Sequence, residues 1–293
     1  MKHMFIVSAP EIRNLAWQED SHLVLPHLYE NKEYLFTYRA MAERGSYLLQ
    51  DNSLFELKET VGGDLIDFGR QIGASCIMIP EVLRDYRGCL DASEEFMATA
   101  ALKPTALQFD FAAALQGKSY EDIRSHYVAL TTRPEFDRIK VIAIPFNFEF
   151  DAIGQSQSEE ARQLGWNRFS IVWKLMRDGV WSFNHRHHLL GLYNPIELSY
   201  YHPDNKLLTA AQYETIQSND SSSCYWHSLY NCLYTVHGLA YRKIESHVDF
   251  TSHFTVGSQL EAWKYNKQRI LSFVAGQGNW NALIGDLIEE AID

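Results

Sequence analysis

The chain has few cysteines, and none of them are paired in a metal-binding or redox motif. Cys76, Cys89, Cys224 and Cys232 form no CxxC or CxC pair, a spacing that argues against a structural zinc site. The apolar run near the N-terminus is short, and no window of about 18 uninterrupted apolar residues follows it. We therefore expect a cytoplasmic protein with reduced thiols and no membrane association.

Positive charge is also scarce. Lys and Arg number 26 against 37 Asp and Glu, a net charge of -11, so any contact with nucleic acid must use a local patch. With 46% hydrophobic and 22% charged residues, the chain is unlike a disordered protein and can bury a sizeable core. A β/α barrel of ~250 residues absorbs nearly all of this length, so we treat 1–293 as one domain.

Short apolar runs alternate with longer segments of helical periodicity, the pattern of a parallel sheet with crossover helices. Seven runs are clear and an eighth, 239–246, is weaker; the seven are 5–9, 46–53, 75–81, 105–117, 140–146, 187–193 and 213–219. The helical segments are 30–45, 62–73, 93–103, 119–133, 158–179 and 222–238, with a helical C-terminal extension over 259–293. The order predicts an α/β fold, a (β/α)8 TIM-type barrel, with an open doubly wound sheet as the alternative.

Polar residues directly follow several of the predicted strands. In a β/α barrel the reacting groups lie at the C-terminal ends of the strands, so these positions are the first candidates for chemistry. A single carboxylate there is often only a helix N-cap, but several that converge on one mouth favour a site. The candidates are Asp51 with Asn52, Glu81, Gln116 with Gly117, Asn147 with Glu149, and Asp220.

Four of these segments share a further pattern. They read DNSLFE (51–56), LQGKSYEDI (115–123), HLLGLYNPIEL (188–198) and IQSNDSSS (216–223). In these motifs and their order, across most of its length, the chain resembles the tRNA-guanine transglycosylase superfamily. The last motif is most similar to the DNA-modifying branch, in which Ser or Thr residues follow the nucleophilic Asp. The resemblance implies a (β/α)8 barrel and a base exchange at a guanine glycosidic bond.

Carried over by motif, the resemblance implies that Asp220 is the nucleophile and Asp51 the general acid and base. Expelling guanine builds oxocarbenium character at the sugar C1′, which a carboxylate stabilises and captures as a covalent glycosyl-enzyme. A second carboxyl group of raised pKa then serves the proton transfers of both half-reactions. This chemistry needs neither a metal nor another cofactor.

The same resemblance implies a set of base-binding residues. Glu81 stands where the family reads the guanine N1–H and 2-amino edge, and Gln116 with Gly117 would face the exocyclic oxygen or the 7-substituent. Asn52 and Gly191 belong to the matching motifs. Phe55 or Tyr193 would stack on the base, with core packing as the plainer interpretation of both aromatics.

Two departures from the family pattern affect the predicted substrate. The CxCxxC-and-His zinc element of the tRNA enzymes has no counterpart after Asp220, and Ser53 and Leu54 replace small residues. These features favour the phage or bacterial branch, which inserts 7-deazaguanine bases of the preQ0 type into DNA in the (host) cytoplasm. The alternatives are a tRNA substrate, a hydrolase that only removes a base, and a catalytically silent nucleic-acid-binding subunit that supports an active homologue.

A duplex substrate requires a flipped guanine and a cationic rim for phosphates. Solvated surface charge is the plainer interpretation of each cation. The oligomeric state is left open, with a homodimer or a partner protein as the alternatives to a monomer. The candidate rim residues are Arg84, Arg87, Lys118, Arg242 and Lys243, followed by Lys264, Lys267 and Arg269 in the last helix.

The remaining polar clusters have simpler interpretations. HRHH at 185–188 resembles a metal-binding HxH, but it lies late in the chain, and we expect a surface or strand-entry histidine cluster. His227 matches no helical face with its neighbours and is expected to be incidental. Ser221 to Ser223 lack a GxSxG context and are expected to cap a helix.

Overall fold

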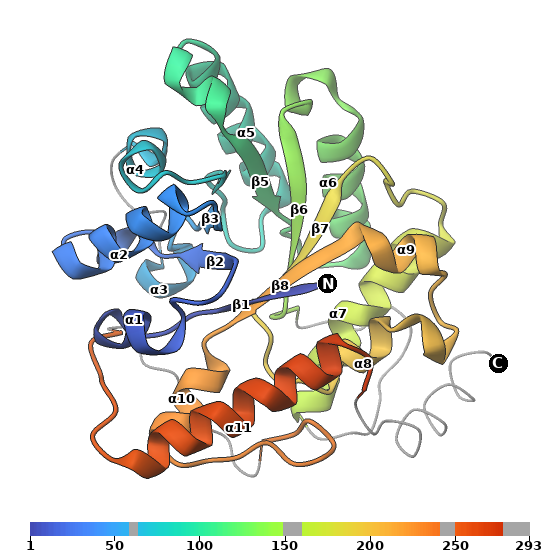
Figure 1. Ribbon diagram of the computed structural model, residues 1–293. Coiled ribbons are helices and arrows are strands. Elements are labelled where there is room, and N and C mark those ends of the chain that lie inside the picture. The colour runs from blue at the N-terminus through green and yellow to red at the C-terminus, as the bar shows by residue number, and fades with distance from the viewer. Residues whose placement is uncertain (59–63, 149–159, 241–249, 278–293) are drawn as a thin grey trace.

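Eight parallel strands form a single sheet in the computed structural model, which describes residues 1–58, 64–148, 160–240 and 250–277 (Figure 1). Their order is β1-β8-β7-β6-β5-β4-β3-β2, so each strand lies beside its neighbour in the sequence except where β8 returns to β1. The strands are β1 Lys2–Phe5, β2 Ser21–Val24, β3 Tyr47–Gln50, β4 Cys76–Met78, β5 Asp110–Ala114, β6 Ile139–Pro145, β7 Arg186–Leu190 and β8 Ile216–Ser221.

The sheet curls into a nearly closed barrel. Its two outermost strands, β1 and β2, lie against each other, although no ladder joins them within the described residues. Pairing of β1 with β8 sets Met4 opposite Asp220 and closes the other side. The predicted (β/α)8 barrel is therefore confirmed.

Helices follow most strands and surround the sheet (Figure 1). Several begin where a side chain caps free backbone N–H groups: Asp64, Asp85 and Ser119 each accept hydrogen bonds from the first turn that follows. The helices are α1 Ile12–Leu15, α2 Lys32–Glu43, α3 Leu54–Leu57, α4 Leu65–Ile72, α5 Tyr86–Ala101, α6 Tyr120–Thr132, α7 Glu160–Arg177, α8 Glu197–Tyr201, α9 Ala210–Thr215, α10 Ser223–Leu229 and α11 Gly257–Val274.

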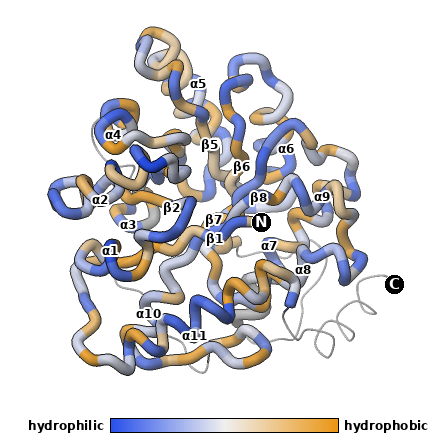
Figure 2. Tube along the Cα trace, in the orientation of Figure 1, coloured by the Kyte–Doolittle hydropathy of each residue, from blue (hydrophilic) through white to orange (hydrophobic). Residues whose placement is uncertain are grey.

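The strands differ in polarity. β5 is apolar beyond its first residue, whereas β8 is mostly hydrophilic (Figure 2). Yet Asn219, Asp220 and Ser221 of β8 are only 0%, 3% and 2% exposed. Buried polar groups cost free energy unless they have hydrogen-bond partners, so a polar strand inside the barrel is a candidate position for a binding or catalytic site.

One strand was placed wrongly by the sequence analysis. The missing member of the barrel is β2, Ser21–Val24, and the eight strands are complete without the weak run at 239–246. Ala240 makes only an isolated antiparallel bridge to Tyr234, and 241–249 lie outside the described residues. The β2 run is only four residues long and half polar, so no apolar pattern revealed it, although all four residues are buried.

The predicted helix over 222–238 was too long. α10 ends at Leu229, whose carbonyl accepts a hydrogen bond from the Gln259 side chain of α11 (2.7 Å). Asn231 then takes a left-handed φ of 52°, which turns the chain away from the helix axis. The predicted C-terminal helix is confirmed as α11, and 278–293 lie outside the described residues.

All four cysteines are buried and free. Within the described residues, no helix combines the length and apolar character needed to cross a membrane.

Candidate active site

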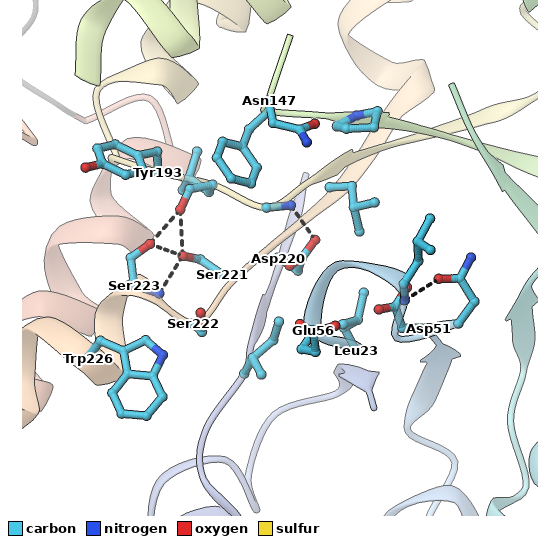
Figure 3. Close-up of a pocket in the computed structure, with 18 of the residues that line it drawn as sticks. Leu23, Asp51, Glu56, Asn147, Tyr193, Asp220, Ser221, Ser222, Ser223 and Trp226 are labelled. Atoms are coloured by element: carbon cyan, nitrogen blue, oxygen red, sulfur yellow. Dashed lines mark hydrogen bonds between the residues drawn. The ribbon is translucent and has the colours of Figure 1, made fainter. Parts of the chain in front are cut away.

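A cavity of about 200 Å³ opens at the C-terminal ends of the strands, where a β/α barrel carries its site (Figure 3). It brings together eight of the predicted residues, from segments that lie far apart in the sequence. These are Asp51, Asn52, Glu81, Gln116, Asn147, Gly191, Tyr193 and Asp220.

Asp220, at the end of β8, is held firmly at one oxygen. Its Oδ1 accepts hydrogen bonds from the backbone N–H of Gly191 (2.9 Å) and from Nε2 of His188 (2.8 Å). Nδ1 of His188 lies 2.8 Å from the Ser218 hydroxyl, so the imidazole that donates to Asp220 can accept from Ser218. Within the described residues Oδ2 has no hydrogen bond, which leaves this oxygen available to a ligand in the cavity.

Gly191 is required at the turn after β7. Its φ is +70°, and a Cβ atom there would lie 2.6 Å from Cδ1 of Phe146. A glycine avoids both the left-handed strain and this clash, so the chain passes close enough to donate its N–H to Asp220.

A buried ion pair braces the same corner of the barrel. The Arg168 guanidinium meets the Glu197 carboxylate in a bidentate pair (2.5 and 2.8 Å) and also donates to the carbonyls of Ile144 (3.0 Å) and Leu190 (2.8 Å). Burial raises the pKa of Glu197, and the contact with Arg168 opposes that rise. Arg168 thereby joins α7, α8 and the ends of β6 and β7 directly before Gly191.

Asp51 follows β3 in a different environment. Its backbone N–H continues the ladder to Val24 (2.9 Å), while its Oδ2 accepts only a long hydrogen bond from Ser53 N–H (3.3 Å). Burial raises the pKa of Asp51 well above its usual value, and the nearby carboxylates of Glu56 and Glu81 add to the rise. Asp51 is therefore suited to carry a proton, in contrast to the donor-bound Asp220.

Glu56 is a functional candidate that the sequence analysis missed. It lies on α3 and lines the cavity near Asp220 and Asp51, as Figure 3 shows. Its buried Oε2 has no hydrogen-bond partner among the described residues, and burial together with Asp220 raises the pKa of this carboxyl group. Glu56 closes the DNSLFE motif, so its place in the motif was the available signal.

Glu81, Asn52 and Gln116 form a connected network. Glu81 accepts from the Asn52 amide (3.1 Å) and from the Gln116 amide (2.7 Å), while Gln116 Oε1 accepts from Arg84 N–H (2.9 Å). Burial raises the pKa of Glu81, and the two amide hydrogen bonds oppose the rise. The predicted base-reading residues are therefore adjacent, but the Gln116 amide is engaged with the protein and a base would have to exchange with these bonds.

The residues that depart from the family motif also have a structural role. Ser53 adopts a left-handed φ of 58°, a conformation that glycine adopts without strain, and its hydroxyl lies 2.8 Å from Nδ1 of His27. Leu54 is buried and lines the cavity, which reduces the space at that wall as its size suggested.

Of the remaining base-binding candidates, one lines the cavity and one does not. Tyr193 faces Phe146 in a stacked arrangement with ring centroids 6.5 Å apart at the cavity wall. Gly117 is not among the residues that line the cavity; a Cβ there would lie 2.6 Å from Cβ of Asp122, so it is a site of close packing. The side chain of Phe55 lies outside the described residues, as does Glu149.

Three of the predicted rim cations are exposed: Arg84 on the turn after β4, Arg87 in the first turn of α5, and Lys118 on the loop after β5. Arg242 and Lys243 lie outside the described residues. In α11, Lys264 and Lys267 pair with Glu261 and Glu19 respectively, and Arg269 donates to Tyr265 (3.1 Å).

The sequence analysis left two interpretations of HRHH open, a surface cluster and a strand-entry cluster. The strand-entry position is confirmed, since β7 begins at Arg186, whereas the surface position is wrong for two of the residues. His187 and His188 are both 0% exposed. His187 stacks on Trp181 with centroids 3.7 Å apart and bonds to the Tyr127 hydroxyl (2.8 Å), and burial lowers its pKa to about 3. His188, on the opposite face of the strand, donates to Asp220. In the described part of the chain, no three His, Cys, Asp or Glu side chains are placed so that they could hold one metal ion.

The serine cluster caps α10 in part, whereas His227 differs from expectation. Ser222 occupies the N-cap position of α10 without a side-chain capping bond, but the Ser221 hydroxyl accepts from the N–H of Ser223, the first residue of the helix (2.9 Å). The hydroxyls of Ser221 and Ser223 also donate to the carbonyl of Leu192 (2.7 Å each) and so join β8 to the turn after β7. His227, expected to be incidental, lines the cavity.

No protein-family model matches the chain, and no curated protein matches it. The fold and site therefore define the protein by their own geometry: a (β/α)8 barrel whose mouth holds four acidic side chains, Asp51, Glu56, Glu81 and Asp220, in one cavity. Such a site can pair a fixed carboxylate nucleophile with a protonated carboxyl group.

Proposed function

We propose that the protein is a transglycosylase that replaces guanine in DNA with a 7-deazaguanine base through a covalent glycosyl-aspartate. The observation that carries the proposal is the contrast between two acids on one cavity: Asp220 is bound by two donors at Oδ1, and Asp51 has a raised pKa. An anionic nucleophile beside a proton-bearing acid is the pairing that exchange at a glycosidic bond requires.

In the first half-reaction, Oδ2 of Asp220 attacks C1′ of the sugar and forms the ester bond. The C1′–N9 bond breaks, its electron pair leaves with the purine, and Asp51 delivers a proton to the departing base. Glu56 and Glu81 favour the protonated form of Asp51 through their negative charge. The His188 and Gly191 donors keep Asp220 oriented throughout.

In the second half-reaction, the ring nitrogen of the incoming 7-deazaguanine attacks C1′ and displaces Asp220, and its proton passes to Asp51. Glu81 accepts from the N–H groups of the base edge after its bonds to Asn52 and Gln116 rearrange. The cavity of about 200 Å³ lies below the ~300–1,000 Å³ typical of drug-sized ligand pockets, which suits a single heterocyclic base.

The test is to incubate the protein with 7-deazaguanine bases and either duplex DNA or tRNA, then identify the nucleosides by mass spectrometry. Incorporation into DNA is expected. Incorporation into tRNA alone would refute DNA as the substrate. Release of guanine without incorporation would indicate a hydrolase, and no reaction with either nucleic acid would refute the base-exchange activity.

A paired substitution tests the nucleophile. Asp220→Asn should abolish the covalent DNA adduct seen on a denaturing gel, whereas Asp204→Asn, which alters an acid with a 71% exposed side chain, should leave it unchanged. An Asp220→Asn protein that still formed the adduct would refute the assignment.

A further inference from the structure

The segment between β4 and α5 forms a pinned turn at the rim of the cavity. Asp85 N–H bonds to the carbonyl of Val82 (3.2 Å) and closes the turn. The Cys89 thiol holds Val82 at both ends, accepting from its N–H (3.0 Å) and donating to its carbonyl (3.2 Å). Leu83 and Arg84 occupy the tip of a turn whose base is fixed to a helix.

The turn combines a left-handed backbone position with exposed apolar side chains. Arg84 has a φ of 60°, a left-handed conformation that a non-glycine side chain adopts at a cost. Leu83 lines the cavity and is nevertheless 40% exposed, and Val82 is 42% exposed. A single exposed leucine is ordinary, but an aliphatic tip on a rigid turn beside a polar cavity is arranged to meet something outside the protein.

Cations surround this tip. Arg84 N–H bonds to Gln116 Oε1 (2.9 Å), which brings the β4–α5 turn beside the loop that carries Lys118. Arg87 packs over the Tyr86 ring and donates to its hydroxyl (3.1 Å), and Lys118 donates its N–H to Asp122 (3.0 Å). Arg84, Arg87 and Lys118 are all exposed and lie on the adjoining β4–α5 and β5–α6 segments, with Asp85 and Asp122 among them. In an otherwise acidic protein, these are the cations at the cavity rim that a phosphate backbone would meet.

These observations combine with the position of the carboxylates inside the cavity. Asp51 and Asp220 are 7% and 3% exposed, so a nucleotide in a duplex must leave the base stack before its C1′ can approach them. Unstacking leaves a gap, and proteins that open a base step often insert an apolar side chain to fill it.

We propose that the turn Val82–Asp85 is a wedge for double-stranded DNA. Leu83 enters the base stack where the target guanine has been extruded, while Arg84, Arg87 and Lys118 bind the flanking phosphates. The inference rests on the proposed function and deepens it: it names a duplex with an extruded base as the substrate form.

The test compares Leu83→Ala with a matched control, Leu102→Ala. Leu102 lies just beyond the far end of α5 and is 84% exposed, so its truncation removes the same atoms away from the cavity. For each protein, kcat/KM for base exchange is measured on one guanine-containing strand, alone and in a duplex. Since unstacking costs a few kcal/mol per step, Leu83→Ala should lower the duplex-to-single-strand ratio of kcat/KM roughly 10- to 100-fold, and Leu102→Ala should leave it unchanged. Leu83→Met, which restores the length, should recover most of the ratio.

The outcomes separate the two proposals. If the wild-type protein exchanges neither strand nor duplex, the proposed function fails. If it exchanges both and Leu83→Ala keeps the wild-type ratio, the function stands and the wedge is refuted. A higher kcat/KM on an RNA stem than on the DNA duplex would overturn DNA as the partner.

A second measurement does not depend on catalysis. A 2-aminopurine placed beside the target guanine reports unstacking through its fluorescence, and the signal should rise with the wild-type protein and with Asp220→Asn, but not with Leu83→Ala. An equal rise with Leu83→Ala would overturn the wedge.

Discussion

Replacing Gly191 with alanine should separate two costs that the structure places at one residue. Alanine pays for the left-handed φ of +70° and also meets Cδ1 of Phe146 at 2.6 Å. The left-handed conformation costs a residue with a Cβ about 1 kcal/mol, and overpacking in a close-packed site typically adds ~1–3 kcal/mol. The free energy of unfolding should therefore fall by about 2–4 kcal/mol.

Gly179 provides the matched control. It has nearly the same φ, +69°, but a Cβ there would have nothing within 4 Å, so Gly179→Ala should lose only about 1 kcal/mol. Urea unfolding of both variants, read as a shift of midpoint at constant slope, gives the difference directly. Adding Phe146→Ala to Gly191→Ala completes a double-mutant cycle that isolates the contact.

Equal losses for Gly191→Ala and Gly179→Ala would refute the close approach to Phe146. The same contact has a consequence for activity. The backbone shift that relieves the clash moves the Gly191 N–H away from Asp220, so the Gly191→Ala protein should lose kcat/KM even where it is folded. Gly179→Ala should keep it.

Three further predictions concern the buried polar groups. His188→Leu removes a hydrogen bond to a carboxylate, worth ~1.5–3 kcal/mol, and should lower kcat/KM by roughly 10- to 150-fold. His188→Gln can still donate to Asp220 and should retain a higher kcat/KM than His188→Leu; equal losses of kcat/KM would contradict the role of His188 as a donor. Folding raises the pKa of Asp51, so the free energy of unfolding should fall as pH rises from the unfolded-state pKa of ~3.9 toward the folded-state pKa. At neutral pH, Asp51→Asn should therefore increase the free energy of unfolding in urea by about 0.5–2 kcal/mol and should flatten this pH dependence. No increase would contradict the raised pKa of Asp51. Arg168→Met leaves the Glu197 carboxylate with only the Tyr201 hydroxyl (3.3 Å) and should lower the free energy of unfolding by about 3–5 kcal/mol. Arg168→Met with Glu197→Leu should be more stable than the single variant; a less stable double variant would contradict the cost of the uncompensated carboxylate.

The sequence was sufficient for the fold because the barrel repeats one pattern. Seven apolar runs overlap seven of the eight strands, and polar residues at their ends point to the mouth. β2 was missed because its apolar run, Leu23–Leu25, is only three residues long and follows the polar Ser21 and His22. The burial of these residues comes from neighbouring strands, which the sequence pattern does not show.

The site was predictable where a polar residue lies at the end of its strand or shortly after it. Asp51, Glu81, Gln116 and Asp220 reach one cavity because parallel strands end at one edge. Glu56 and His188 were not predictable in the same way. Glu56 enters through the short helix α3, and His188 lies inside β7, where its direction depends on which face of the strand is turned inward.

The four buried cysteines can report local unfolding, because a thiol reagent reaches them only when the surrounding structure opens. Burial raises the pKa of Cys76 and of Cys89 to about 12, so the folded protein should resist alkylation until a segment unfolds. Cys76 lies in β4, whereas Cys224 lies in α10, four residues after the proposed nucleophile. If Cys224 is labelled before Cys76, the segment around Asp220 and α10 opens independently of the barrel. If both are labelled at the same rate, they open only when the whole barrel unfolds.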